Sequence, residues 1–124
     1  MFRYYNPNPV GRQSVGDCSI RALAKALNVS WEDAYAMAAA NGYQMGDLPS
    51  SNSVWGAVLR QHGFYRENIP NICPQCYTVE EFAMDNPVGT YVLGTGNHVV
   101  TVVDGDWYDT WDSKDEVPVY FWVR

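Results

Sequence analysis

The sequence predicts an α+β fold in which helices come first along the chain and an antiparallel sheet follows. Apolar residues recur with helical spacing up to about residue 86. After about residue 90 the pattern changes to short β-branched and aromatic runs separated by turn residues. This order is typical of the α+β class. We expect a single domain over residues 1–124, with a helical half at about 17–86 and an antiparallel sheet at about 90–124.

The first predicted helix begins at a cysteine. From Cys18 onward, Ile20, Leu23, Ala24 and Leu27 recur at helical spacing and form one apolar face. Two basic residues, Arg21 and Lys25, lie one turn apart on another face. Asn28-Val29 then breaks the pattern.

Three further helices are expected before residue 86. One starts after a capping signature at Ser30 and ends at Asn41-Gly42. The next ends at Gly63, and Thr78-x-x-Glu81 has the capping-box pattern that begins a short fourth helix. Segments 4–16 and 64–77 contain prolines, and their apolar residues follow neither helical nor strand spacing. We expect an irregular lead-in at 4–16 and an ordered loop at 64–77.

Four short strands are expected at 91–93, 99–103, 107–111 and 117–123. Asp104-Gly105, between the second and third of them, is a strong hairpin signal.

Composition limits the functions that fit. The 124 residues are 47% hydrophobic, and 14 acidic against 8 basic residues give a net charge of −6, which argues against nucleic acid as a partner. Residues 1–7 lack the apolar core of a signal peptide, and no run is long enough to span a bilayer. We therefore expect a cytoplasmic protein without membrane contact. Its three cysteines leave at least one thiol unpaired within the chain.

Cys18 is the first candidate for chemistry. Unpaired N–H groups and the positive end of the dipole at a helix N-terminus stabilise a thiolate, which can lower a cysteine pKa from ~8.5 to about 3.5–7.5. Most free cysteines are small buried hydrophobes instead. The rest of the chain has to decide between these two interpretations.

A histidine and two aspartates complete a possible catalytic set. His98 stands at the start of the strand that enters the Asp104-Gly105 hairpin, and Asp109 and Asp112 follow the turn. A three-residue loop would place Asp112 opposite His98, and a two-residue loop would place Asp109 diagonal to it. Cysteine nucleophiles need an imidazole that moves the proton and a third group that orients the ring.

These residues resemble the papain-like cysteine peptidases. Asp17-Cys18 before a helical run is similar to the nucleophile position of that superfamily, and His98-Val99-Val100 to its histidine strand. Asp109-Thr110-Trp111-Asp112 resembles the Asn-Ser-Trp-Gly of papains and the Asn-Pro-Trp-Gly of calpains. The resemblance implies that Asp109, rather than Asp112, orients the histidine, and that Trp111 shields their hydrogen bond.

The resemblance also implies an oxyanion role for Gln13, which is similar to the oxyanion-hole glutamine but lies five residues before Cys18 where papain has six. It implies a papain-like fold, and the short chain is closest in size to minimal bacterial and phage members. Substrate-binding loops are not carried over.

Two other patterns in the sequence are candidate sites. Cys73-Pro74-Gln75-Cys76 has the spacing of a redox pair or half a zinc site, but neither the strand–helix context nor two further ligands are visible. The acidic region from Asp104 to Glu116 lacks the glycine and glutamate that an EF-hand loop needs. We expect no metal and no cofactor.

The favoured hypothesis is a thiol hydrolase that cleaves a peptide, isopeptide or related amide bond of a peptide or protein substrate, with Cys18, His98 and Asp109 as its triad. Transfer of the acyl group to an amine, as in transglutaminases, would use the same residues. The alternative from another class is a binding or counter-defence protein that keeps the fold without catalysis. The oligomeric state stays open.

Overall fold

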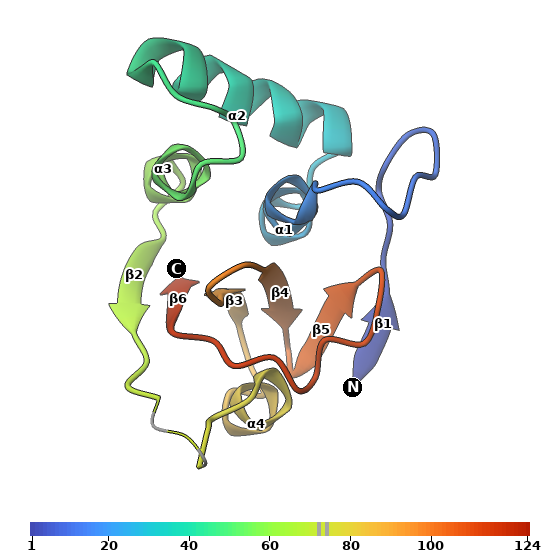
Figure 1. The fold of residues 1–124 in the computed structure, drawn as a ribbon, viewed down its shortest axis with the longest axis vertical. Coiled ribbons are helices and arrows are strands. Elements are labelled where there is room, and N and C mark those ends of the chain that lie inside the picture. The colour runs from blue at the N-terminus through green and yellow to red at the C-terminus, as the bar shows by residue number, and fades with distance from the viewer. Residues whose placement is uncertain (72, 74) are drawn as a thin grey trace.

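A computed structural model describes residues 1–71, 73 and 75–124, which form four helices and a six-stranded mixed sheet. Helices α1 and α3 lie against one face of the sheet, α4 covers the opposite face, and α2 packs on the outside of α1 and α3 (Figure 1). The general α+β prediction is therefore confirmed. In chain order the elements are β1 (Phe2–Tyr4), α1 (Cys18–Leu27), α2 (Trp31–Met45), α3 (Asn52–Gln61), β2 (Tyr65–Asn68), α4 (Val79–Asp85), β3 (Thr90–Gly94), β4 (Val99–Val103), β5 (Asp106–Asp109) and β6 (Tyr120–Val123).

The sheet contains strands that the sequence pattern did not predict. Its order is β1-β5-β4-β3-β6-β2, with β1 parallel to β5 and all other pairs antiparallel. The outer strand β1 precedes the expected irregular lead-in and shares only Tyr4 with it, and β2 lies in the segment expected to be an ordered loop. The prediction of an antiparallel sheet confined to 90–124 was therefore wrong. Each is only three or four residues long and pairs with a strand distant in sequence, so neither has a periodic signal of its own.

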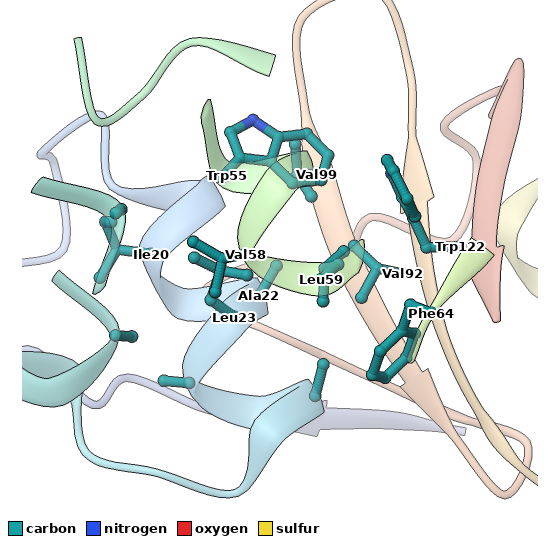
Figure 2. Packing of buried hydrophobic residues seen from close by; sticks show 14 of the residues in the cluster. Ile20, Ala22, Leu23, Trp55, Val58, Leu59, Phe64, Val92, Val99 and Trp122 are labelled. Carbon is teal, nitrogen blue, oxygen red and sulfur yellow. The ribbon is translucent and has the colours of Figure 1, made fainter. Parts of the chain in front are cut away.

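Apolar side chains of α1 and α3 form the larger core against the sheet. Leu23 of α1 and Val58 and Leu59 of α3 are fully buried, and they face Val92 of β3 and Trp122 of β6 (Figure 2). The apolar stripe predicted for the first helix is thus the face that binds α1 to the sheet. Asn28 ends α1 in the left-handed conformation.

Helix α2 begins as predicted and ends later than predicted. The Ser30 hydroxyl accepts a hydrogen bond from the Asp33 N–H, which is the expected cap. The helix passes through Gly42 and stops at Gly46, which has a left-handed φ of 68°. Gly42 is needed inside the helix for another reason: a Cβ there would lie 2.6 Å from the Asp47 carbonyl oxygen.

Helix α4 and the opposite face of the sheet form the second core. The Thr78 hydroxyl accepts from the Glu81 N–H while the Glu81 carboxylate accepts from the Thr78 N–H, so the predicted capping box is confirmed. Phe82 packs against Tyr91 and Phe121, and its ring centroid lies 5.2 Å from the ring centroid of each.

The β4–β5 turn has two residues. Val103 pairs with Asp106, and Asp104 and Gly105 both have positive φ, at 50° and 83°. This is the conformation that a two-residue hairpin turn requires. The register that follows places Asp109 diagonal to His98. Strand β5 ends at Asp109, two residues earlier than predicted.

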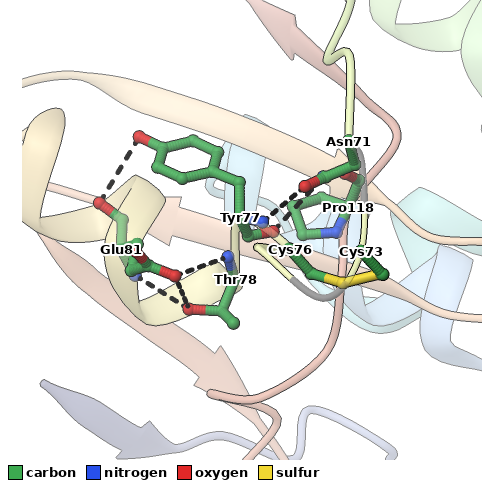
Figure 3. Close-up of a disulfide and its surroundings, with 7 residues drawn as sticks. All are labelled: Asn71, Cys73, Cys76, Tyr77, Thr78, Glu81 and Pro118. Atoms are coloured by element: carbon green, nitrogen blue, oxygen red, sulfur yellow. Dashed lines mark hydrogen bonds between the residues drawn. A yellow bond between two sulfur atoms is a disulfide. The ribbon is translucent and has the colours of Figure 1, made fainter.

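A disulfide joins Cys73 to Cys76 in the loop before α4 (Figure 3). In the same loop the Asn71 amide donates to the Pro118 carbonyl and accepts from the Tyr77 N–H. These bonds attach the loop to the segment that leads into β6.

Gly94 of β3 allows the Tyr120 ring of β6 to cross the strand, because a Cβ at this glycine would lie 2.0 Å from Tyr120 Cζ. We expect Gly94→Ala to lower the free energy of unfolding by about 1–3 kcal/mol, since the ring would have to move. Urea denaturation measures this. Gly96→Ala is the matched control, because no atom lies within 4 Å of its added Cβ. Equal losses in the two variants would contradict the packing argument.

Candidate active site

Cys18 is the first residue of α1, and its half-buried thiol faces the start of β4. It lines one cavity together with His98 and Val99, and both of these residues lower the pKa of the thiol. In the described part of the chain it is the only cysteine outside a disulfide. The helix that was predicted to present this thiol therefore places it against the predicted histidine.

His98 directly precedes β4, in a turn held by Thr95. The Thr95 hydroxyl accepts from the backbone N–H groups of Asn97 and His98, and the Thr95 N–H donates to the His98 carbonyl. The His98 side chain is hydrogen-bonded through Nε2 to Asp109 Oδ2 at 2.6 Å. Since Nε2 is occupied, the other ring nitrogen is left for the Cys18 thiol.

The Asp109 carboxylate is almost completely buried, with 1% of the residue exposed. Besides the His98 ring, it accepts hydrogen bonds from the Ser113 hydroxyl at 2.9 Å, the Thr110 N–H at 2.8 Å and the Arg21 guanidinium at 3.1 Å. Four donors thus satisfy both oxygens and fix the side chain that orients the histidine.

Arg21 is a further member of the site that sequence reasoning missed. It was assigned to a polar face of the first helix, but it is buried, with 6% exposed, and its guanidinium bridges Asp109 and Asp17. The Asp17 carboxylate also accepts from Trp31 Nε1 at 2.9 Å. The i,i+4 spacing of Asp17 and Arg21 was the available signal. Ser113 was missed as well, and a lone serine carries no sequence signal.

These contacts shift three pKa values. Burial alone would raise the pKa of the Cys18 thiol, but its hydrogen bonds to His98 and Val99 and the charges of His98 and Arg21 bring it below its ordinary value. Burial would lower the pKa of His98, but Asp109 and Cys18 outweigh it and raise the pKa to about 9. The pKa of Asp109 is lowered because bonds from His98, Ser113 and Thr110, with the His98 charge, outweigh burial. The shifts favour a thiolate beside an imidazolium.

Trp111 and Asp112 make different contacts. Trp111 is 45% exposed, and its ring centroid lies 4.9 Å from that of His98. The Asp112 carboxylate instead accepts from Trp107 Nε1 at 2.9 Å and from the Lys114 N–H. No hydrogen bond joins Asp112 to His98 within the described residues.

The fold does not place Gln13 beside Cys18 and His98. It is exposed in the segment between β1 and α1 and does not line the cavity at Cys18. Asn52 does line this cavity. Its side-chain oxygen Oδ1 accepts a hydrogen bond from Trp55 Nε1 at 3.1 Å, which leaves the N–H groups of the side-chain amide available as donors. The oxyanion role of Gln13 therefore stays a prediction without a supporting contact.

The thiol lines one cavity, which shares lining residues with two others. The one of about 160 Å³ is lined by Cys18 and His98. It shares Gly16 and Ser19 with a neighbour of about 230 Å³, walled by the stacked rings of Trp31 and Tyr35. It shares Asn52 with another of about 350 Å³ between α3, β2 and β6.

Comparisons with known proteins found no matching family model, curated protein or solved structure. Among the residues that the structure describes, no group of three or more His, Cys, Asp or Glu side chains could hold a metal ion. None of the helices in these residues is long and apolar enough to cross a membrane.

Arg21→Met would leave two buried carboxylates without their cation. We expect it to lower the free energy of unfolding by about 3–5 kcal/mol. Adding Asp17→Asn should restore part of the loss, because one of the unpaired charges is then removed. Chemical denaturation of the single and double variants measures both effects.

Arg3→Met is the matched control, because Arg3 pairs with Asp106 at the surface and its loss should cost no more than about 1 kcal/mol. If Arg21→Met cost as little as Arg3→Met, the buried network would not stabilise the fold.

Proposed function

We propose that the protein is a thiol hydrolase of papain-like type, which cleaves a peptide, isopeptide or related amide bond through an acyl-enzyme on Cys18. The observation that carries the proposal is that Cys18 and His98 line one cavity while His98 is hydrogen-bonded to the buried Asp109. A buried carboxylate that orients a histidine beside a thiolate is the arrangement that nucleophilic cysteine chemistry needs. The resemblance of the short motifs around these residues supports the same conclusion.

The chemistry assigns one task to each group. The Cys18 thiolate attacks the carbonyl carbon, and His98 gives its proton to the leaving amine as the C–N bond breaks. A water molecule then attacks the thioester while His98 takes its proton, so the thiolate leaves and the product carboxylic acid is released. Asp109 keeps the ring in place and stabilises the imidazolium in both steps.

The developing oxyanion would face the N-terminus of α1. The backbone N–H groups of the first turn have no partner inside the helix, and that of Cys18 is next to the reacting sulfur. The Asn52 amide is a second candidate donor because it lines the same cavity. Gln13 would have to move toward the thiol to take this role.

Two other functions would use the same site. Transfer of the acyl group to an amine shares the acyl-enzyme, with an amine in place of water. A binding or counter-defence protein would keep the cleft without an activated thiol. Thiol reactivity distinguishes the second of these from both catalytic functions.

We expect limiting iodoacetamide near pH 6 to modify Cys18 well before Cys73 and Cys76, in protein whose disulfide has been reduced. An ordinary thiol is almost fully protonated at that pH, whereas His98 stabilises the Cys18 thiolate. Peptide mapping by mass spectrometry measures the modification. His98→Ala should remove the preference, because a helix N-terminus contributes only ~0.3–1 kcal/mol, less than one pKa unit. Equal labelling of all three thiols, or a preference unchanged by His98→Ala, would favour the binding-protein function.

Asp109→Ala should lower kcat/KM for a generic activated ester, such as a p-nitrophenyl ester of an N-acyl glycine, by about 10²-fold or more. Asp112→Ala should change it by no more than about twofold, because Asp112 does not contact His98. The reverse ranking would transfer the orienting role to Asp112.

Asp109→Asn keeps a hydrogen-bond acceptor for Arg21. This variant therefore separates the effect of Asp109 on His98 from its effect on the stability of the fold. The upper limb of the pH profile reports deprotonation of His98, whose pKa is about 9. Loss of the carboxylate charge lowers the pKa of His98. In a plot of kcat/KM against pH, the upper limb should therefore lie at lower pH for Asp109→Asn than for the wild-type protein. An unmoved limb would show that Asp109 does not act on His98.

A further inference from the structure

The cavity of about 350 Å³ beside the catalytic cavity concentrates positive charge. It is lined by Arg60 of α3 and Arg66 of β2, and by no acidic residue. The protein as a whole carries 14 acidic and only 8 basic residues. The charge of this cavity is therefore opposite in sign to the net charge of the protein. Among the described residues, neither arginine forms a salt bridge.

Aromatic rings hold both guanidinium groups in place. Arg60 Cζ lies 5.2 Å from the Trp122 ring centroid, and Arg66 Cζ lies 4.2 Å from that of Tyr120. Arg66 Nη1 also donates to the Asn68 side chain at 2.9 Å. Stacking restricts these long side chains, so less conformational entropy is lost when they bind a ligand. Among the described residues, the remaining guanidinium N–H groups have no hydrogen-bond acceptor.

The same cavity wall contains a polar group without a partner. The Trp122 residue is only 3% exposed, and its Nε1–H has no acceptor among the described residues. The ring lies so close to α3 that a Cβ on Gly56 would be 2.8 Å from its Cζ2 atom. The ring that supports Arg60 is therefore packed tightly against α3 and held in one position in the cavity wall.

This cavity adjoins the proposed catalytic centre. Asn52 lines both cavities. Trp55 lines the catalytic one and stacks on Tyr120 of the other, with ring centroids 6.4 Å apart. The two cavities are therefore neighbours, and the inference below places one substrate across both.

We infer that the cavity binds a carboxylate of the substrate, and that it selects amide bonds next to an acidic side chain or a free C-terminus. The inference rests on the proposed function for the identity of the ligand as a peptide. Carboxylates are the anionic groups of peptides, and guanidinium groups bind them through charge-assisted hydrogen bonds. Side-chain and C-terminal carboxylates share this chemistry.

The first experiment follows the indole N–H resonance of Trp122 by ¹⁵N NMR, assigned with Trp122→Phe. N-acetyl-glutamate amide presents a side-chain carboxylate, N-acetyl-glutamine a main-chain carboxylate, and N-acetyl-glutamine amide neither. We expect a saturable shift with one or both of the acids and none with the neutral compound. Arg60→Gln or Arg66→Gln should weaken binding at least about tenfold.

Arg124→Gln is the matched control. Arg124 also stacks on a ring, that of Phe64 at 4.9 Å, but it lies outside the cavity, so its loss should leave the titration unchanged. No shift with either acid, an equal shift with the neutral compound, or equal effects of the three arginine variants would overturn the inference. The titration is repeated in Cys18→Ala, so its outcome does not depend on whether the thiol is catalytic.

The second experiment compares peptidyl electrophiles that carry glutamate or glutamine next to the reactive group. Inactivation of the wild-type protein should be at least about tenfold faster with the acidic compound, and this preference should be lost in Arg60→Gln and Arg66→Gln. Equal rates would overturn selection by the cavity. Failure of iodoacetamide to label Cys18 would instead overturn the proposed function, and the NMR titration would still test the cavity.

Discussion

The buried carboxylate of Asp109 is the constraint on which the site depends. A charge with 1% exposure loses most of its hydration, so it needs compensation from the protein. Arg21, His98, Ser113 and the Thr110 N–H supply this compensation from α1, from the start of β4 and from the segment after β5. The same bonds that satisfy the carboxylate therefore fix the position of the helix that carries Cys18 relative to the sheet that carries His98.

Acidic and basic groups alternate along this network. Asp17 pairs with Arg21, Arg21 with Asp109, and Asp109 with His98, which lowers the pKa of the Cys18 thiol. Each basic group thus lies between two acidic groups, and this compensation allows the network to be largely buried. The two ends differ in exposure: Asp17 is buried against Trp31, whereas the Cys18 thiol reaches the cavity. The Cys18 thiol is thus the accessible end of an otherwise buried network.

Local signals predicted the parts of the site that neighbouring residues determine. Asp104-Gly105 predicted the hairpin but left a two-residue and a three-residue loop open. The structure has the two-residue turn, and its register places Asp109 diagonal to His98. Apolar spacing predicted the helix that begins at Cys18. Arg21 could not be predicted in the same way, because a charge on a helix is usually solvated, and its burial depends on Asp109, 88 residues away. Strands β1 and β2 were missed for the same reason.

The cavity beside the site illustrates the same limit. Its two arginines come from α3 and β2, and the rings on which they stack come from β6, more than 50 residues later in the chain. From the sequence alone, each arginine is predicted to be a solvated side chain at the surface. They become a binding surface only because β6 pairs with β2 and packs against α3, where Gly56 leaves room for the Trp122 ring. The pairing that builds the sheet edge therefore also determines which charges a substrate would meet after passing Cys18.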